Sequence, residues 1–73
     1  MTTKREHVVR RGLVQVSVRC RAYRTGLRFS VRASRLYKDG DVWRESLRFG
    51  RDDVPVLRLA LDEAHTWMLQ QTK

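Results

Sequence analysis

Residues 14–22 read VQVSVRCRA, a stretch in which apolar and polar residues alternate without interruption. Successive side chains of a β-strand point to opposite faces, so this alternation predicts a strand that is buried on one face only. The buried face would carry Val14, Val16, Val18, Cys20 and Ala22, and the other face Gln15, Ser17, Arg19 and Arg21.

Two further strands are predicted over residues 27–34 and 42–49, where apolar residues again alternate with arginine and serine. Residues 38–41, KDGD, predict the hairpin turn between them. A three-residue loop over residues 39–41 is preferred, because the resulting pairs are chemically favourable. These pairs are Tyr37 with Trp43, Arg35 with Glu45, Ala33 with Leu47, and Val31 with Phe49. Trp43, Leu47 and Phe49 are therefore expected on the buried face.

The period of the pattern changes after residue 52. Apolar residues then recur at spacings of three and four, which predicts an amphipathic helix over about residues 53–71. Asp52 and Asp53 precede Pro55, as expected for capping residues at a helix start. The predicted fold class is α+β, an antiparallel three-stranded sheet followed by one C-terminal helix packed on one face.

The N-terminal residues 1–12 are open to two interpretations, a basic arm or an extra strand. Residues 7–11 would form a fourth strand, or begin the first strand with a bulge at Gly12. Residues 1–6 are expected to be a disordered basic arm. Residues 13–73 would form a single β-β-β-α domain.

The length of 73 residues limits the chain to one domain, whose core would contribute no more than about 3 to 5 kcal/mol. Cys20 has no partner for a disulfide, and Cys20, His7 and His65 are too few for a structural zinc site. We therefore expect a homodimer without metal or cofactor. No apolar run is long enough to span a membrane and residues 1–12 lack the apolar stretch of a signal peptide, so the sequence favours a cytoplasmic protein.

Charge is the strongest functional signal in the sequence. The net charge is +8, with 13 Arg against 3 Lys, and arginine suits bidentate recognition of phosphate or carboxylate groups. Residues 13–51 carry a net charge of +7 and residues 52–73 one of −2. This asymmetry predicts that the sheet faces a polyanion while the helix packs.

The predicted open face of the sheet bears six arginines with short hydroxyl side chains between them and no acidic residue. Grouped guanidinium groups repel one another and need a counter-charge, and serine can bond phosphate oxygens. Two tyrosines at strand ends are candidates for stacking on unpaired bases. The predicted nucleic-acid-binding residues are Arg19, Arg21, Arg24, Arg28, Arg32, Arg44, Arg48, Ser30, Ser46, Tyr23 and Tyr37.

Catalysis finds no support in the sequence. No paired acids share a predicted strand face, His65 stands alone on the helix, and Cys20 is expected to point inward. The four glycines lie at strand ends and form no phosphate-binding loop. No catalytic residue is predicted, and Trp43, Phe29, Phe49 and Trp67 are interpreted as core residues.

The order of three strands and a helix, with an arginine-rich open sheet over about residues 13–71, resembles the Whirly, Pur-alpha and positive-cofactor coactivator modules. That resemblance implies a dimer that binds single-stranded DNA or RNA on its sheets. Separately, residues 34–40 (SRLYKDG), Trp43, Ser46, Phe49, residues 51–53 (RDD) and residues 64–67 (AHTW) are similar to a group of short bacterial proteins without an assigned function.

Three functions remain as hypotheses. Binding of single-stranded nucleic acid is preferred. The second is duplex DNA binding by a sheet laid in the major groove, because the element order also resembles integrase arm-binding and ethylene-response-factor domains. The third is a protein-interaction subunit that docks an acidic partner.

Overall fold

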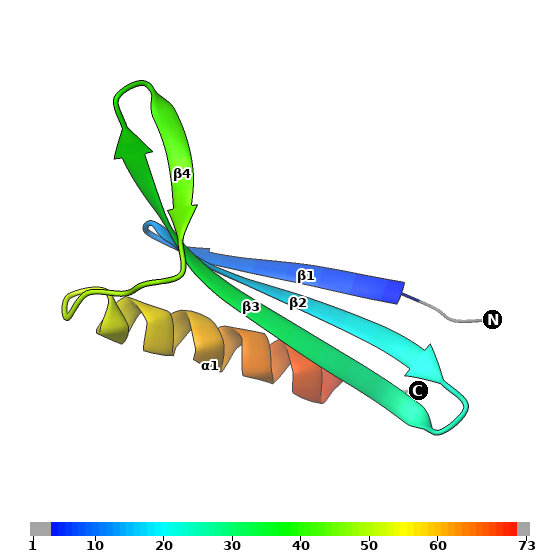
Figure 1. Ribbon diagram of the computed structural model, residues 1–73. Helices are drawn as coiled ribbons and strands as arrows, with labels where there is room; N and C mark the ends of the chain where they lie inside the picture. Colours follow the sequence, from blue (N-terminus) through cyan, green and yellow to red (C-terminus); the bar gives the residue numbers. More distant parts are fainter. Residues whose placement is uncertain (1–3, 72–73) are drawn as a thin grey trace.

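Residues 14–22 lie in the middle of an antiparallel sheet, with a strand on either side (Figure 1). The computed structural model describes residues 4–71. Within that range the strands follow one another in the order of the sequence, so each neighbouring pair is joined by a hairpin. The α+β class and the C-terminal helix are confirmed. The elements are β1 (Lys4–Arg11), β2 (Val14–Tyr23), β3 (Gly26–Asp39), β4 (Val42–Ser46) and α1 (Val54–Gln70).

The helix packs on one side of the sheet, against β1 and β2. The alternate residues of β2 from Val14 to Cys20 are buried there, as predicted. Ala60 and Ala64 are the buried residues of α1, and their small side chains allow the helix backbone to approach the sheet closely. Phe29 and Trp67 pack against this core, and His65 is exposed. We call the side of the sheet that carries α1 the helix side and the opposite side the outer face.

The extra strand is formed, and it begins earlier than the expected basic arm allows. Residues 4–6 belong to β1, which corrects the expectation of disorder for them; residues 1–3 lie outside the described residues. The sequence signal is weak because the helix side of β1 is mostly polar. Arg5 donates to Gln71 over 3.0 Å, His7 stacks on Trp67 at 5.0 Å, and Arg11 forms an ion pair with Glu63. Only Val9 is buried.

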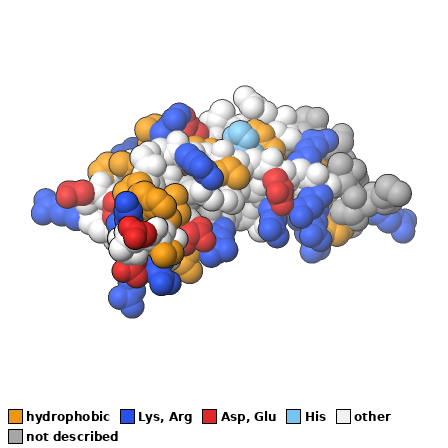
Figure 2. All heavy atoms as spheres, turned by 90° about the horizontal axis from the view of Figure 1, so that it is seen from above, with side chains coloured by type: hydrophobic (Ala, Val, Ile, Leu, Met, Phe, Trp, Pro, Cys, Tyr) orange, Lys and Arg blue, Asp and Glu red, His pale blue; other side chains and the backbone are white. Residues whose placement is uncertain are grey.

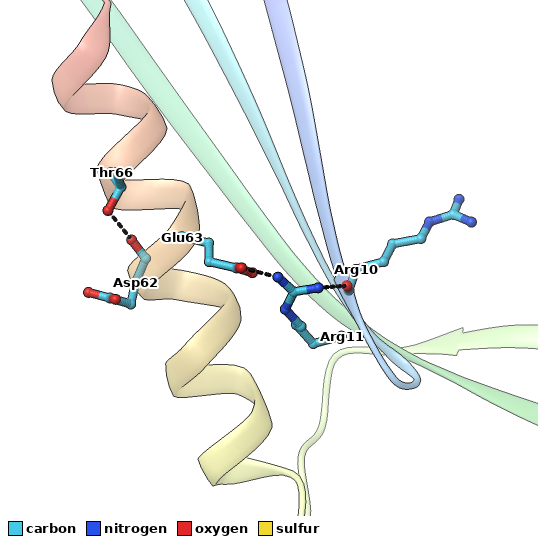
Figure 3. A network of polar contacts seen from close by, with 5 residues as sticks. All are labelled: Arg10, Arg11, Asp62, Glu63 and Thr66. Carbon is cyan, nitrogen blue, oxygen red and sulfur yellow. Dashed lines mark hydrogen bonds and ion pairs between the residues drawn. The ribbon is translucent and has the colours of Figure 1, made fainter.

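Figure 3 shows this alternation at the end of β1. Arg11 reaches towards Glu63 on α1, whereas the side chain of Arg10 extends away from the helix. Neighbouring arginines of one strand therefore have different environments. One anchors the helix and the other is left on the outer face.

The predicted register of the β3–β4 hairpin is wrong by one residue. Asp39 pairs with Val42, which leaves the two-residue loop of Gly40 and Asp41 in place of the predicted three-residue loop. Gly40 has φ of 62°, and no non-glycine residue described has positive φ. Glycine at the first position with an ordinary second residue is the requirement of a type II′ turn, whose twist matches the strands. Gly12, with φ of 59°, occupies the same place between β1 and β2.

The shifted register inverts the faces of β4. Trp43 lies opposite Lys38 and is 57% exposed, instead of facing the core. The strand also ends at Ser46, earlier than the predicted residue 49, so the expected pairs of Leu47 and Phe49 do not form. Leu47 is exposed, while Phe49 still packs on the core from the connection to α1.

That connection is held by Asp53. Its Oδ2 accepts a hydrogen bond of 2.8 Å from the backbone N–H of Gly50 and lies 3.2 Å from Nε of Arg35 on β3. The side chain makes no capping bond to the helix, which corrects its predicted role at the helix start. Asp53 instead fixes the direction in which the chain leaves the sheet.

Candidate nucleic-acid interface

The outer face of β2 and β3 is built by the ladder between them. Arg21 lies opposite Arg28, Arg19 opposite Ser30, and Ser17 opposite Arg32. Opposite residues of a ladder share a face, and these six residues alternate with the core residues of both strands. The sequence prediction for this part of the sheet is therefore reproduced by the structure in position and in facing.

Two shallow hollows adjoin along this ladder, of about 320 and 310 Å³, and both are lined by Arg19 and Ser30. The first extends to Tyr23 and Arg28, and the second to Arg32. We call the part of the outer face that these two adjoining hollows cover the arginine groove. Its outer-face side chains are Ser17, Arg19, Arg21, Tyr23, Arg28, Ser30 and Arg32.

The centre of the charge in the groove is the pair Arg21 and Arg28. Like charges placed directly opposite each other in a ladder are unfavourable. Within residues 4–71 neither side chain forms an ion pair with a carboxylate. The guanidinium carbon of Arg28 lies 5.2 Å from the ring centre of Tyr23, which holds the side chain across the end of β2. Figure 2 views the molecule from above Figure 1 and shows Lys and Arg side chains along its whole length.

The outer face was expected to be free of acidic residues, but among the described residues it carries two. Oε1 of Glu6 on β1 lies 3.3 Å from Nε of Arg19 and 3.2 Å from Nζ of Lys4. Oε2 of Glu45 on β4 lies 3.7 Å from Nη2 of Arg32. Glu6 comes from residues 1–6, which were expected to be an arm, and Glu45 comes from β4, which was expected in another register. They flank the arginine groove on both sides.

Glu45 is also anchored by the fold. Its Oε1 accepts a hydrogen bond of 2.9 Å from the hydroxyl of Ser34, which is buried. Glu6, by contrast, forms ion pairs with Lys4 and Arg19, whose side chains are themselves exposed. An anion that reaches the groove must compete with both carboxylates for Arg19 and Arg32.

Several predicted site residues lie away from the groove. Arg44 and Tyr37 are opposite each other on the reverse side of the β3–β4 hairpin, where Nε of Arg44 lies 2.9 Å from Asp39. Ser46 is opposite Arg35, and its hydroxyl oxygen accepts a bond of 3.1 Å from the backbone of Arg48 in the connection to α1. For Arg44 and Ser46 the correction follows from the one-residue change of register, since such a shift moves every side chain of a strand to the other face. Arg48 lies outside the sheet because β4 ends at Ser46, and Tyr37 keeps the facing that its place in β3 gives it. Arg24 lies in the turn that follows Tyr23.

Three residues that the sequence did not indicate also lie on the outer face. Lys4 and Arg10 arrive with β1, and Trp43 arrives with β4, opposite Lys38. The signal that identifies Trp43 is the glycine at position 40, because a two-residue loop that begins with glycine fixes its facing. For β1 the outer face alternates Lys4, Glu6, Val8 and Arg10, a pattern with too little apolar contrast to detect.

Other parts of the described chain offer less defined chemistry. Residues 4–71 contain no group of three or more His, Cys, Asp or Glu side chains placed to hold a metal ion. Cys20 is buried, as predicted. A further hollow lies on the solvent side of α1, between Arg58, Asp62 and His65, with apolar residues around it. No helix within these residues is long and apolar enough to cross a membrane.

No family model, no curated protein and no solved structure matches this chain. The resemblance to Whirly, Pur-alpha and positive-cofactor coactivator modules therefore stays a prediction from the order of the elements.

Proposed function

We propose that the protein is a binding module, not an enzyme, and that it binds single-stranded DNA or RNA in the arginine groove. The observation that carries the proposal is the opposition of Arg21 and Arg28 in the ladder without a carboxylate partner among the described residues. A phosphate between two guanidinium groups relieves their repulsion and accepts hydrogen bonds from both.

The spacing of the arginines in the groove favours a nucleic-acid strand with several phosphates over a single anion as the ligand. Arginines recur along β2 and β3 at intervals of two and four residues, so their Cα atoms are about 7 to 13 Å apart. Ser30 lies between Arg28 and Arg32, Ser17 lies opposite Arg32, and both hydroxyls can donate to phosphate oxygens. A shallow basic groove with an aromatic ring at its end is the arrangement by which proteins bind single strands without sequence preference.

The test is a titration of the full chain with a labelled 20-nucleotide single strand of DNA, the same sequence as RNA, and the matching duplex. Contacts of four arginines with phosphates give a slope of log affinity against log salt of about −2.8. Raising the salt from 50 to 200 mM then weakens binding by about 50-fold.

Two double variants localise the binding. Arg21→Ala with Arg28→Ala removes two groove cations, and the slope should fall by about 1.4. The control is Arg44→Ala with Arg58→Ala, which also removes two positive charges, one on the reverse side of the β3–β4 hairpin and one on α1. This variant should leave the affinity and the salt slope nearly unchanged. Equal losses from both variants contradict the groove assignment.

The other hypotheses predict different outcomes of the same titration. Tighter binding of the duplex than of either single strand favours a sheet in the major groove. The absence of binding to any oligonucleotide at 50 mM salt favours an acidic protein partner.

A further inference from the structure

The most unusual side chain of the outer face is Trp43. It is 57% exposed, whereas the other tryptophan, Trp67, is half-buried and stacked on His7. An exposed tryptophan ring opposite a lysine offers a free π-face and a cation, the two groups by which proteins hold an unpaired nucleotide. We propose that Trp43 is a stacking site for an unpaired base of the nucleic acid whose phosphates bind in the arginine groove.

The proposal rests on the proposed function and on the position of Trp43 relative to the groove. The β3–β4 hairpin bends away from α1 and so rises on the outer side of the sheet (Figure 1). Along β3, Lys38, opposite Trp43, follows Arg32, at the end of the groove, by six positions. The separation is at most about 20 Å along the strand, a distance that a few nucleotides of an extended single strand cover.

The charges around Trp43 agree with a nucleotide as its occupant. Lys38 lies directly opposite on the same face and can neutralise the phosphate beside the stacked base. The nearest acidic residue on that face of β4 is Glu45, whose two oxygens contact Ser34 and Arg32. The carboxylate of Glu45 is thereby held beside Arg32, at the groove.

Stacking on Trp43 would also make the protein bind a single strand more tightly than a duplex. The faces of bases in a duplex are covered by their neighbours, whereas every base of a single strand has a free π-face. The contribution of a stacked aromatic side chain is sequence-tolerant for the same reason. Trp43 is therefore expected to increase affinity for a single strand and to leave affinity for a duplex unchanged.

The first measurement uses the fluorescence of Trp43 itself. In Trp67→Phe the tryptophan emission comes from Trp43 alone. A 20-nucleotide thymidine strand should quench this emission over the same concentration range in which the anisotropy of the labelled strand rises. The tryptophan emission of the unmodified chain should also be quenched in part, and this quenching should be absent in Trp43→Phe. The second comparison does not depend on whether the Trp67 variant folds.

The second measurement is the affinity of Trp43→Ala. Loss of one stacked base should weaken binding of the thymidine strand by about 5- to 150-fold, with the salt slope unchanged because no phosphate contact is removed. The matched control is Val42→Ala, which alters the adjacent residue of β4, 53% exposed and facing the other way. It should bind like the unmodified chain.

The outcomes separate the two proposals. Salt-dependent binding without quenching, and with normal affinity in Trp43→Ala, overturns the stacking site and leaves the groove intact. The stacking site is also overturned if Trp43→Ala loses equal affinity for the single strand and the duplex. The same holds if Trp43→Ala changes the oligomeric state and keeps normal affinity. If no oligonucleotide binds at 50 mM salt, both proposals are wrong.

Discussion

The carboxylates that flank the arginine groove should restrain the binding of a polyanion. Glu6 contacts Arg19 at 3.3 Å and Glu45 contacts Arg32 at 3.7 Å, so a phosphate competes with each carboxylate for its arginine. The double variant Glu6→Gln with Glu45→Gln removes this competition. The glutamine amide oxygen can still accept the hydrogen bond from Ser34 that Glu45 accepts, so the hairpin should keep its position.

The expected gain follows from the exposure of the two ion pairs. All four side chains are more than two-fifths exposed, and exposed pairs contribute about 0.2 to 1 kcal/mol each. Release of two pairs should therefore tighten the binding of a single strand by about 2- to 30-fold. The gain should be larger at 50 mM than at 200 mM salt, because salt screens exposed charges.

Asp39→Asn supplies the control for net charge. Asp39 is an exposed carboxylate that contacts Arg44 at 2.9 Å, but on the reverse side of the hairpin. Affinities from the anisotropy of a labelled 20-nucleotide strand, compared per charge removed, should rise for the Glu variants and stay nearly constant for Asp39→Asn. An equal rise per charge would show that net charge alone matters, and it would refute competition within the groove.

Three further results are expected. Cys20→Ser should lower the free energy of unfolding by about 1 to 3 kcal/mol in urea titration, because it places a hydroxyl among buried apolar side chains, and Cys20 should react slowly with a thiol reagent in the native state. Gly40→Ala should cost about 1 kcal/mol in the same assay, since its φ of 62° is unfavourable for alanine. We expect a homodimer in light scattering at high micromolar concentration, because apolar side chains of the sheet and of α1 stay exposed, among them Val31 at 45% and Leu61 at 41%. A monomer at that concentration contradicts this expectation.

Much of the arginine groove could be predicted from the sequence alone. Arg19, Arg21, Arg28 and Arg32 alternate with valine, cysteine and phenylalanine on two neighbouring strands. Any register that buries the apolar set on one face places these arginines together on the other. Tyr23 and Ser30 follow from the same alternation. The prediction needed only the period of each strand and no knowledge of distant contacts.

The sequence was less informative for the two outer strands, β1 and β4. The helix side of β1 carries Arg5, His7 and Arg11, which read as solvent-exposed until Gln71, Trp67 and Glu63 are brought to them by the fold. These partners follow more than 50 residues later in the chain, so no local pattern reveals them. The acidic side of the groove was missed for the same reason, since Glu6 belongs to β1.

The sequence by itself determined the elements whose pattern is local, namely β2, the first part of β3 and α1. Their side-chain periods of two and of three to four specify which face is buried. Only the tertiary structure decided which side of the hairpin carries Trp43 and which carries Arg44. The physical reason is that β4 contributes little to the core, so its apolar pattern does not set the register. The turn at Gly40 sets it instead, and a shift of one residue there exchanges the two faces of the strand.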